Sequence, residues 1–515
     1  MGHEQRLLWP GNSWFTTAMK RFLTAMSRWL AGLLAIGLVV GPLAAASRAD
    51  KAAALLQAQL LGHIIELASD GYEGREPGTE GEVKTLRYIG KQLSEIGLVS
   101  GTNDPSHPWF APVTLVGREP DASRATFSRK GRRLFVPQDQ VLVLTSGKRA
   151  LIESAPMVFV GNGAVIPQRA DLAGRVALLL DGGRSDSERQ NALLQAGASA
   201  VLTVLDGDRT LDSVAARRKQ LGYALAGEEL GGDLDAFITA SALGGALAGI
   251  KQSVASLQAA AAAPTFVAKP LDLAISLEAT TRETRIRTHN VIAKLPGKRP
   301  DLGAVLLVAH WDHFGKCAVP PAEHLICNGA VDNASGVAVL IETARRLSKL
   351  SQMDRDVYLL ATTGEELGLL GAEAFVENPP IPLSQFVAAF NIDSVAIGPA
   401  GQPFAIVGQG LTKLDPQIAL VAKQQKKKLV QLDYTKAFVR RQDGWIFLQH
   451  DLPAVMVSSS WSDQARVERY MDTDYHRPSD IVKPGLELGG AADDVDFLIA
   501  LVRWFADPKK VPKRL

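Results

Sequence analysis

The sequence predicts an α/β protein with a mostly parallel mixed sheet flanked by helices and an inserted, smaller, β-rich α/β domain. Three observations lead to this fold class. From residue 290 onward, short apolar runs alternate with segments of helical periodicity, a pattern typical of parallel strands connected by helices. Between residues 113 and 247, closely spaced apolar runs instead indicate a second set of strands. The length of 515 residues is enough for two or three domains.

The main domain is expected to combine two separate parts of the chain, residues 47–112 and 266–515. In the first part, helices are expected at 52–67 and 80–98, separated by a glycine-containing loop. In the second part, the expected strands are 291–295, 305–309, 357–361, 388–392 and 454–457, and the expected helices are 335–350, 368–377, 416–425 and 491–506.

The inserted domain is expected to span residues 113–265. Its predicted elements are strands at 157–160, 176–180 and 200–205 and a helix at 191–198. None of these strands ends in a cluster of His, Cys, Asp or Glu, so no metal chemistry is expected in this domain. The alanine-rich segment 255–263 is interpreted as the linker that returns the chain to the main domain.

Residues 1–46 have the composition of a secretory signal peptide. Lys20, Arg21 and Arg28 precede an apolar run at 29–40, and small residues follow up to Ala46, where cleavage is expected. The run is shorter than the roughly 20 apolar residues of a stable membrane span. We therefore expect a periplasmic or secreted protein without a stable membrane span, and an uncleaved anchor is the alternative. Translation could instead begin at Met19 or Met26.

The overall charge argues against a nucleic-acid partner. The formal net charge is only +2, which is too small to indicate a surface for polyanions.

The two cysteines, Cys317 and Cys327, do not form a CxxC zinc motif. In an oxidising compartment they could form a disulfide, and a pair of free buried thiols is the alternative.

The expected strand ends carry a set of histidine and acidic residues. His310 follows the run 305–309, Glu365 and Glu366 follow 357–361, and Asp393 ends 388–392. Asp332 begins an expected helix, and His476 lies in a later loop. Because open parallel sheets place their sites at the carboxyl ends of strands, these side chains are expected to converge on one edge.

The chemistry of this set indicates two metal ions. Two histidines and three carboxylates are too many for one tetrahedral zinc with an open position, but they suit two ions that share a bridging carboxylate. Asp312, two residues after His310, could accept a hydrogen bond from the imidazole and orient it. Each residue alone has a structural alternative: His310 as a structural histidine, Glu365 and Glu366 as a solvated helix start, or Asp332 as a helix cap. Only the ordered set indicates a site.

Five segments resemble the co-catalytic zinc aminopeptidases, the family of the bacterial leucyl aminopeptidases and, more distantly, of glutamate carboxypeptidase and the transferrin receptor. They occur in the family's order: residues 309–315 (AHWDHFG), 328–336 (NGAVDNASG), 363–368 (TGEELG), 391–393 (NID) and 475–476 (YH). Residues 67–98 are similar to the family's amino-terminal segment, and 113–265 resembles an inserted protease-associated domain. The resemblance implies a zinc-exopeptidase fold.

The resemblance also implies a role for each site residue. Asp332 would bridge two zinc ions, His310 and Asp393 would complete one ion, and Glu366 and His476 would complete the other. Glu365 would be the general base, Asp312 would orient His310, and Tyr475 would contact the substrate near the oxyanion. A hydroxide bridging the metals would attack the scissile carbonyl after Glu365 takes its proton. The inserted domain would border the site entrance.

The expected function is removal of amino-terminal residues from peptides. Two departures from the family pattern leave the side-chain preference open: both cysteines lie between Phe314 and Asn328, and Arg440 begins a segment where relatives often carry Ser-Asp-His. The alternatives are a carboxypeptidase that uses Arg440 and Arg441, a one-zinc cyclase, and a receptor-like relative without metals. The sequence predicts no particular oligomeric state.

Overall fold

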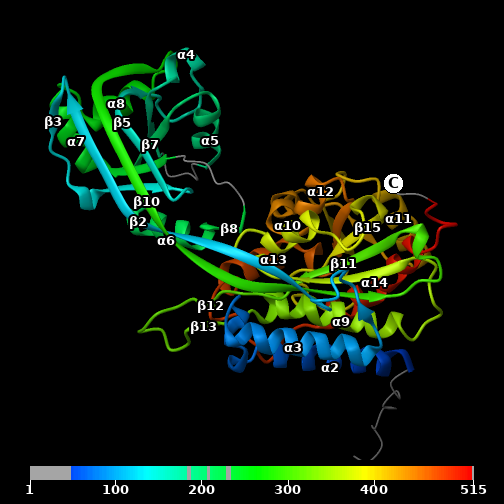
Figure 1. The fold of residues 1–515 in the computed structure, drawn as a ribbon. Coiled ribbons are helices and arrows are strands. Elements are labelled where there is room, and N and C mark those ends of the chain that lie inside the picture. Colours follow the sequence, from blue (N-terminus) through cyan, green and yellow to red (C-terminus); the bar gives the residue numbers. More distant parts are fainter. Residues whose placement is uncertain (1–47, 182–186, 206–208, 228–233, 513–515) are drawn as a thin grey trace, which may run out of the picture. The chain divides into compact units, whose positions relative to one another are not determined.

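A computed structural model describes residues 48–181, 187–205, 209–227 and 234–512 (Figure 1). The chain divides into two compact units, Met1–Leu55 and Leu56–Leu515, and every residue of the predicted site lies in the second. The predicted signal peptide lies outside the described residues. Within the described part of the chain, no helix is both long and apolar enough to cross a membrane.

The predicted fold class is confirmed by the central sheet of the main domain. Its strand order is β17-β16-β18-β15-β11-β14-β10. β11 (Ala304–His310) lies parallel to both β14 (Asp356–Thr362) and β15 (Phe386–Asn391), and β18 (Ala454–Ser458) is parallel to β15. Every residue of these four strands is buried, which explains their continuous apolar runs. Next to β18 lies β16 (Phe404–Val407), which is antiparallel to it, and β17 (Leu429–Val430) pairs parallel to β16 and forms the edge.

Helices cover both faces of this sheet. On one face, α3 (Glu80–Ile96), α9 (Gly336–Leu347) and α14 (Gly489–Phe505) share one core with Val305 and Leu307. On the other face, α10 (Leu370–Glu377) and α12 (Gly444–Gln449) pack with the alternate side chains of the same strands. Figure 1 shows α9 and α3 on the side of the sheet opposite α10 and α12.

Helix α3 illustrates how the sequence sets an element. Leu86, Ile89 and Leu93 recur at helical spacing and are buried, so one face of the helix joins the core. The helix ends at Gly97, whose φ of 92° is in the left-handed region. Its N–H donates to the carbonyls of Leu93 and Ser94, as expected of a glycine that closes a helix.

The inserted segment has its own hydrophobic core, and its strands continue the same sheet beyond β10. Its strand order is β5-β6-β7-β9-β4. The strands are β5 (Arg149–Phe159), β6 (Val176–Leu180), β7 (Ala200–Leu205), β9 (Leu234–Thr239) and β4 (Val141–Thr145), and the helices include α5 (Ser187–Gln195) and α7 (Ala240–Ala248). The segment expected to be a linker at 255–263 is largely helix α8 (Val254–Ala261), so that prediction was wrong. Ser253 and Ser256 form a capping box at its start, and alanine has the highest helix propensity.

One long strand crosses the first expected domain boundary, and a second long strand begins just after the other boundary. β2 (Phe110–Arg129) contains residue 113, and β10 (Lys269–Leu295) begins well before the strand expected at 291–295. β10 pairs with β5 near its start, with β2 along most of its length, and with β14 near its end. Its central part alternates polar and apolar residues, so no apolar run in the sequence indicated a strand there.

The remaining elements are short or peripheral. They are α2 (Arg48–Leu67), β1 (Val99–Ser100), β3 (Arg132–Leu134), α4 (Arg169–Leu172), α6 (Leu211–Leu221), β8 (Tyr223–Leu225), β12 (Gly315–Lys316), β13 (Ile326–Cys327), α11 (Asp415–Gln424) and α13 (Gln464–Thr473).

Candidate active site

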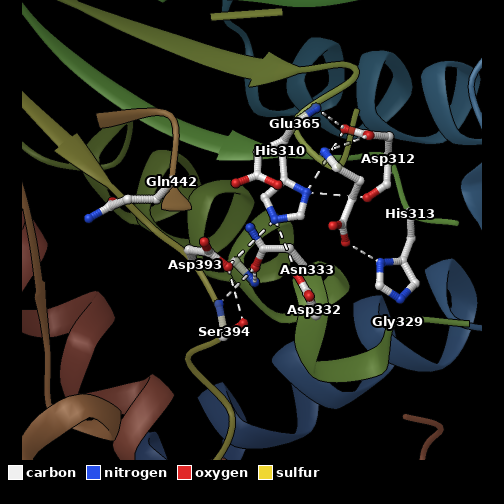
Figure 2. A network of polar contacts seen from close by, with 12 residues as sticks. His310, Asp312, His313, Gly329, Asp332, Asn333, Glu365, Asp393, Ser394 and Gln442 are labelled. Atoms are coloured by element: carbon white, nitrogen blue, oxygen red, sulfur yellow. Dashed lines mark hydrogen bonds and ion pairs between the residues drawn. The ribbon is translucent and has the colours of Figure 1, made fainter. Parts of the chain in front are cut away.

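The carboxyl ends of three neighbouring parallel strands bring the predicted site residues together. His310 ends β11, Glu365 follows β14 by a short turn, and Asp393 lies two residues beyond β15. The register pairs His310 with Thr362 of β14, so the strand ends are level. Asp332 reaches the same edge from the turn Ala330–Ser335 that precedes α9. Figure 2 shows the side chains of His310, Asp332 and Asp393 pointing toward one another.

The carboxylate of Asp332 lies between two histidines. Its Oδ1 is 3.2 Å from His310 Nε2, and its Oδ2 is 3.3 Å from His476 Nε2. Asp393 Oδ1 lies 3.5 Å from His310 Nε2, and Glu366 Oε2 lies 3.1 Å from His476 Nε2. The five expected ligands therefore form two adjacent groups that share Asp332.

These distances fit metal ligation. Ligand atoms at about 2.0–2.2 Å from one tetrahedral zinc lie roughly 3.3–3.6 Å from each other, close to the separations observed. His476 Nε2 is buried, and none of the described residues makes a hydrogen bond of normal geometry to it, although two carboxylates face it. Burial lowers the pKa of His310, but nearby Glu365, Asp332 and Asp393 outweigh burial and raise that pKa well above its usual value. The site thus stabilises positive charge, and its imidazole nitrogens and carboxylate oxygens are suitable ligands for a borderline divalent ion.

Glu365 differs from the other carboxylates in its surroundings. It belongs, with His310 and Asp393, to a group whose ligand atoms lie within 4.8 Å of one another. Burial raises the pKa of Glu365 well above its usual value, and nearby Glu366 and Asp393 add to this effect. No hydrogen bond to its side-chain oxygens occurs among the described residues. A buried carboxyl whose oxygens are not held by other side chains is suited to exchanging a proton with a bound water.

Asp312 contacts the main chain beside Glu365 rather than the ring of His310. Its Oδ1 and Oδ2 accept hydrogen bonds from the N–H groups of Glu365 and Glu366, at 3.2 and 3.4 Å. His310 Nδ1 is 3.2 Å from the backbone carbonyl of Asp312 but 3.9 Å from its carboxylate. The expected orienting contact to His310 is therefore made by the carbonyl, and burial raises the pKa of the Asp312 carboxyl to about 7.

Comparison with known proteins relates the part of the chain that carries these residues to a family. A model described as Peptidase family M28 matches residues 290–492, which include His310, Asp332, Glu365, Asp393 and His476. This part of the chain is similar to peptidase family M28.

Individual relatives cover limited parts of the molecule. The vacuolar membrane protease of Lachancea thermotolerans is 30% identical over 133 residues, which are 26% of this chain and 12% of that protein. Aminopeptidase YwaD of Bacillus subtilis is 26% identical over 283 residues, 54% of this chain and 51% of that protein. The chain thus spans about half of the length of these curated relatives, or less. The solved aminopeptidase from Aneurinibacillus sp. strain AM-1 has a similar fold, with a TM-score of 0.53, 19% identity, and coverage of 88% of this chain and 94% of that chain.

The turn that carries Asp332 in the M28 segment is held by two residues that the sequence did not single out. Asp480 accepts hydrogen bonds from the N–H groups of Val331 and Asp332, both at 3.0 Å. Arg75 is fully buried, and its guanidinium donates to backbone carbonyls that include those of Trp311 at 2.8 Å and Gly329 at 3.0 Å. Arg75 lies within residues 67–98, which resemble the family's amino-terminal segment, and the resemblance implied no role for it.

His313 is a further residue whose contact the sequence did not reveal. Its Nδ1 is 2.5 Å from Glu366 Oε1, while Glu366 Oε2 faces His476. The imidazole is buried, so this contact holds the Glu366 carboxylate in one orientation. The sequence feature that could have indicated this contact is the position of His313 as the second histidine of the AHWDHFG motif.

Tyr475 lies against the metal-ligand candidates. Its ring stacks on His476 at a centroid distance of 3.6 Å. Burial raises the pKa of its hydroxyl well above the usual value, helped by the charges of Asp332 and Glu366, so the hydroxyl stays protonated. Tyr475 therefore presents a hydrogen-bond donor beside the site.

The cysteines and the segment that begins at Arg440 are both placed by the structure. Cys317 and Cys327 form a disulfide across the β12–β13 hairpin, with their Cα atoms 5.7 Å apart.

Arg441 and Gln442 line a small cavity with Asp393, whereas Arg440 stacks on Trp445. The unusual segment therefore borders the site through some of its residues, which the sequence could not locate.

Proposed function

We propose that this chain is an exported aminopeptidase that binds two zinc ions and hydrolyses amino-terminal residues from peptides. The observation that carries the proposal is the position of Asp332, whose two oxygens face His310 and His476 separately. A carboxylate placed in this way suits two adjacent ions. Export is inferred from the signal-like amino terminus.

Each ion would have its own ligands. His310, Asp393 and Asp332 would hold one ion, and His476, Glu366 and Asp332 would hold the other. Bound zinc ions would polarise the scissile carbonyl and lower the pKa of an attacking water.

The protein's own groups would move the proton and hold the substrate. Glu365 would accept a proton from the attacking water at its carboxylate and deliver it to the leaving nitrogen. Asp312 would keep Glu365 in place through the hydrogen bonds that its carboxylate accepts from the backbone N–H groups of Glu365 and Glu366. The Tyr475 hydroxyl would donate to the developing oxyanion.

Amine recognition is favoured over recognition of a carboxyl terminus. Glu365, Glu366 and Asp393 surround the reacting centre with carboxylates, which attract a charged α-amine. A carboxypeptidase would need arginine near the metals to hold a terminal carboxylate. Arg440 stacks on Trp445, and neither Arg440 nor Arg477 lines the cavity beside Asp393, so neither is a candidate for that task. Arg441 lines that cavity and keeps this alternative testable.

The test compares one short peptide with a free amino terminus and the same peptide acetylated. Acetylation removes the charge and should nearly abolish hydrolysis, with the first residue as the sole early product by mass spectrometry. Equal cleavage of both peptides with release of the carboxyl-terminal residue would support the carboxypeptidase alternative. The metal content of the purified protein distinguishes both the aminopeptidase and the carboxypeptidase from a receptor-like protein without metals.

A further inference from the structure

Helix α3 borders a cavity of about 650 Å³ whose lining includes none of the candidate metal ligands. This volume lies within the range of roughly 300–1,000 Å³ that is usual for small-molecule sites. One wall is a single face of α3 over residues 79–94, since the lining residues recur at intervals of three and four positions. The facing wall consists of residues 109–110 at the start of β2 and of Arg287 and His289 in β10. We call this cavity the α3 groove.

Two contacts show how the walls of the α3 groove run beside each other. His289 Nδ1 lies 3.1 Å from Glu82 Oε1, in the first turn of α3. A Cβ atom at Gly90 would lie 2.9 Å from Phe110 Cζ, so the Phe110 ring lies against the later part of the helix. Arg287, two positions before His289, is therefore near the start of α3, and Phe110 is nearer its end.

The floor of the α3 groove is apolar. Leu86 is buried, Trp109 and Phe110 are half-buried, and Val83 is 44% exposed although its side chain is aliphatic. Trp109 has a φ of 72°, in the left-handed region that is uncommon for a bulky residue, and its N–H donates to Ser100 Oγ at 3.1 Å. Such backbone conformations are concentrated at functional sites. The floor thus offers a fixed apolar surface to a ligand.

The rim of the α3 groove is positively charged. Arg87 on the helix wall and Arg287 on the strand wall are both exposed. Neither forms an ion pair with an acidic side chain in the described part of the chain. Glu82 is the acidic residue among the described lining residues, and both of its carboxylate oxygens are engaged, by His289 Nδ1 at 3.1 Å and by the N–H of Gly78 at 2.5 Å. The rim would therefore attract an anionic group.

The α3 groove has few partners for the polar backbone of a peptide. The hydroxyl groups in its lining are those of Thr79 and Ser94, and the Thr79 hydroxyl already donates to the backbone carbonyl of Glu76 at 2.6 Å. Beyond its first turn, α3 uses its own N–H and C=O groups within the helix. A bound peptide would leave buried amides unpaired, which is unfavourable, whereas a hydrocarbon chain has no such groups.

We propose that the α3 groove binds a free long-chain carboxylate of the fatty-acid class. The carboxylate would accept hydrogen bonds from the Arg287 guanidinium near the start of α3. The hydrocarbon tail would lie over Val83 toward Trp109 and Phe110, and Arg87 would add to the positive potential of the rim. The inference depends neither on the metals nor on peptidase activity, so it can fail while the proposed function stands, and the reverse.

The binding test is isothermal titration calorimetry of the purified protein with dodecanoate below its micelle concentration. The wild type should bind one dodecanoate per chain with a saturable isotherm. Butanoate has the head group without the long tail, and dodecyltrimethylammonium has the tail with a cationic head group. Each should bind at least about 10-fold more weakly, because one of the two contributions is missing or reversed.

Variants of the two walls test the assignment of head group and tail. Arg287→Gln should lower the affinity for dodecanoate by about 10-fold, because a charge-assisted hydrogen bond is lost. Arg285→Gln is the matched control and should leave the affinity unchanged, since Arg285 is also exposed on β10 but lines an adjacent cavity and not the α3 groove. Val83→Glu should abolish binding by placing a carboxylate in the path of the tail, and an unchanged Tm would show that this variant is folded.

Several outcomes would overturn the proposal. They are a wild type without saturable dodecanoate binding, equal affinity for dodecanoate in wild type and Arg287→Gln, or equally tight binding of dodecyltrimethylammonium. Binding to phosphatidylglycerol vesicles that is lost in Arg287→Gln, without binding of dodecanoate, would assign the groove to a membrane surface instead. A concentration-dependent dimer that is lost in Val83→Glu, again without dodecanoate binding, would assign it to a second copy of this chain.

Discussion

Asp480 holds the backbone of Asp332 by accepting its N–H at 3.0 Å, although the two residues lie 148 positions apart in the chain. The other carboxylate oxygen of Asp480 accepts the N–H of Val331, and the Tyr470 hydroxyl donates to Asp480 at 3.1 Å. Asp332 is the residue on which both proposed ion sites depend. The position of its carboxylate is therefore set by a residue that would contact neither ion.

Replacing Asp480 should weaken metal binding without removing a ligand. Asp480→Asn keeps the shape but leaves one of the two backbone N–H groups without an acceptor, so zinc affinity should fall by about 10–100-fold. Competition with a chromogenic chelator measures this change. Tyr470→Phe is the control, since it removes one contact to Asp480 and leaves both backbone contacts, and its effect should be smaller. Unchanged affinity in Asp480→Asn would show that Asp480 does not position Asp332.

Removal of metal should abolish activity and lower stability. The two groups around Asp332 predict close to two zinc ions per chain by elemental analysis. A strong chelator should inactivate the protein and lower its Tm, because bound ions stabilise the folded state and the buried carboxylates repel one another without them. Added zinc should restore both. Full activity in protein shown to be metal-free would contradict the proposed mechanism.

Glu365→Gln should separate catalysis from metal binding. Glutamine keeps the shape but cannot accept the proton, so kcat should fall by at least about 100-fold. The zinc content should stay at the wild-type value, because Glu365 is proposed as the base and not as a ligand. Glu366→Gln is the comparison, since it alters a proposed ligand and should reduce metal affinity. Turnover near the wild-type rate in Glu365→Gln would assign the base to another residue.

The disulfide of the β12–β13 hairpin should contribute to stability. Cys317 and Cys327 are 10 positions apart, and closing a loop of this size lowers the entropy of the unfolded chain. The double variant Cys317→Ser with Cys327→Ser should lose roughly 2–3 kcal/mol of unfolding free energy in denaturant titrations. Reduction of the wild type should produce a similar loss. Two titratable thiols in the native protein would contradict the pairing.

Asp494 should make stability depend on pH. Burial raises the pKa of this carboxyl to about 7, although it accepts hydrogen bonds from Ser458 and Ser459. Because the folded pKa lies above the unfolded value of about 3.9, the native state favours the protonated form. This contribution is fully present below about pH 4 and is lost as the pH rises to about 7.

Asp494→Asn should remove that pH dependence, because asparagine does not ionise. The difference in Tm, variant minus wild type, should increase between about pH 4 and 7 and level off above. Asp493→Asn is a suitable control, since the Asp493 carboxylate forms an ion pair with Lys427 at 2.7 Å. A Tm difference for Asp494→Asn that is constant over this range would contradict the raised pKa.

The sequence by itself determined the main elements and the site residues that lie at strand ends. The apolar runs at 305–309 and 357–361 are almost the whole of β11 and β14, because strands buried on both faces need continuous apolar residues. His310 and Asp393 stand at the ends of such runs, so their convergence followed from the topology of a parallel sheet. These predictions came from the local pattern of apolar residues along the chain.

Only the tertiary structure decided which residues support that site. Arg75 and Asp480 are ordinary charged residues in the sequence, and their roles come from contacts with segments far away in the chain. Asp312 illustrates the same limit, since its carboxylate turned toward the main chain of Glu365. Spacing along the chain predicts which backbone forms a strand or helix, whereas the partner of a polar side chain depends on how those elements pack.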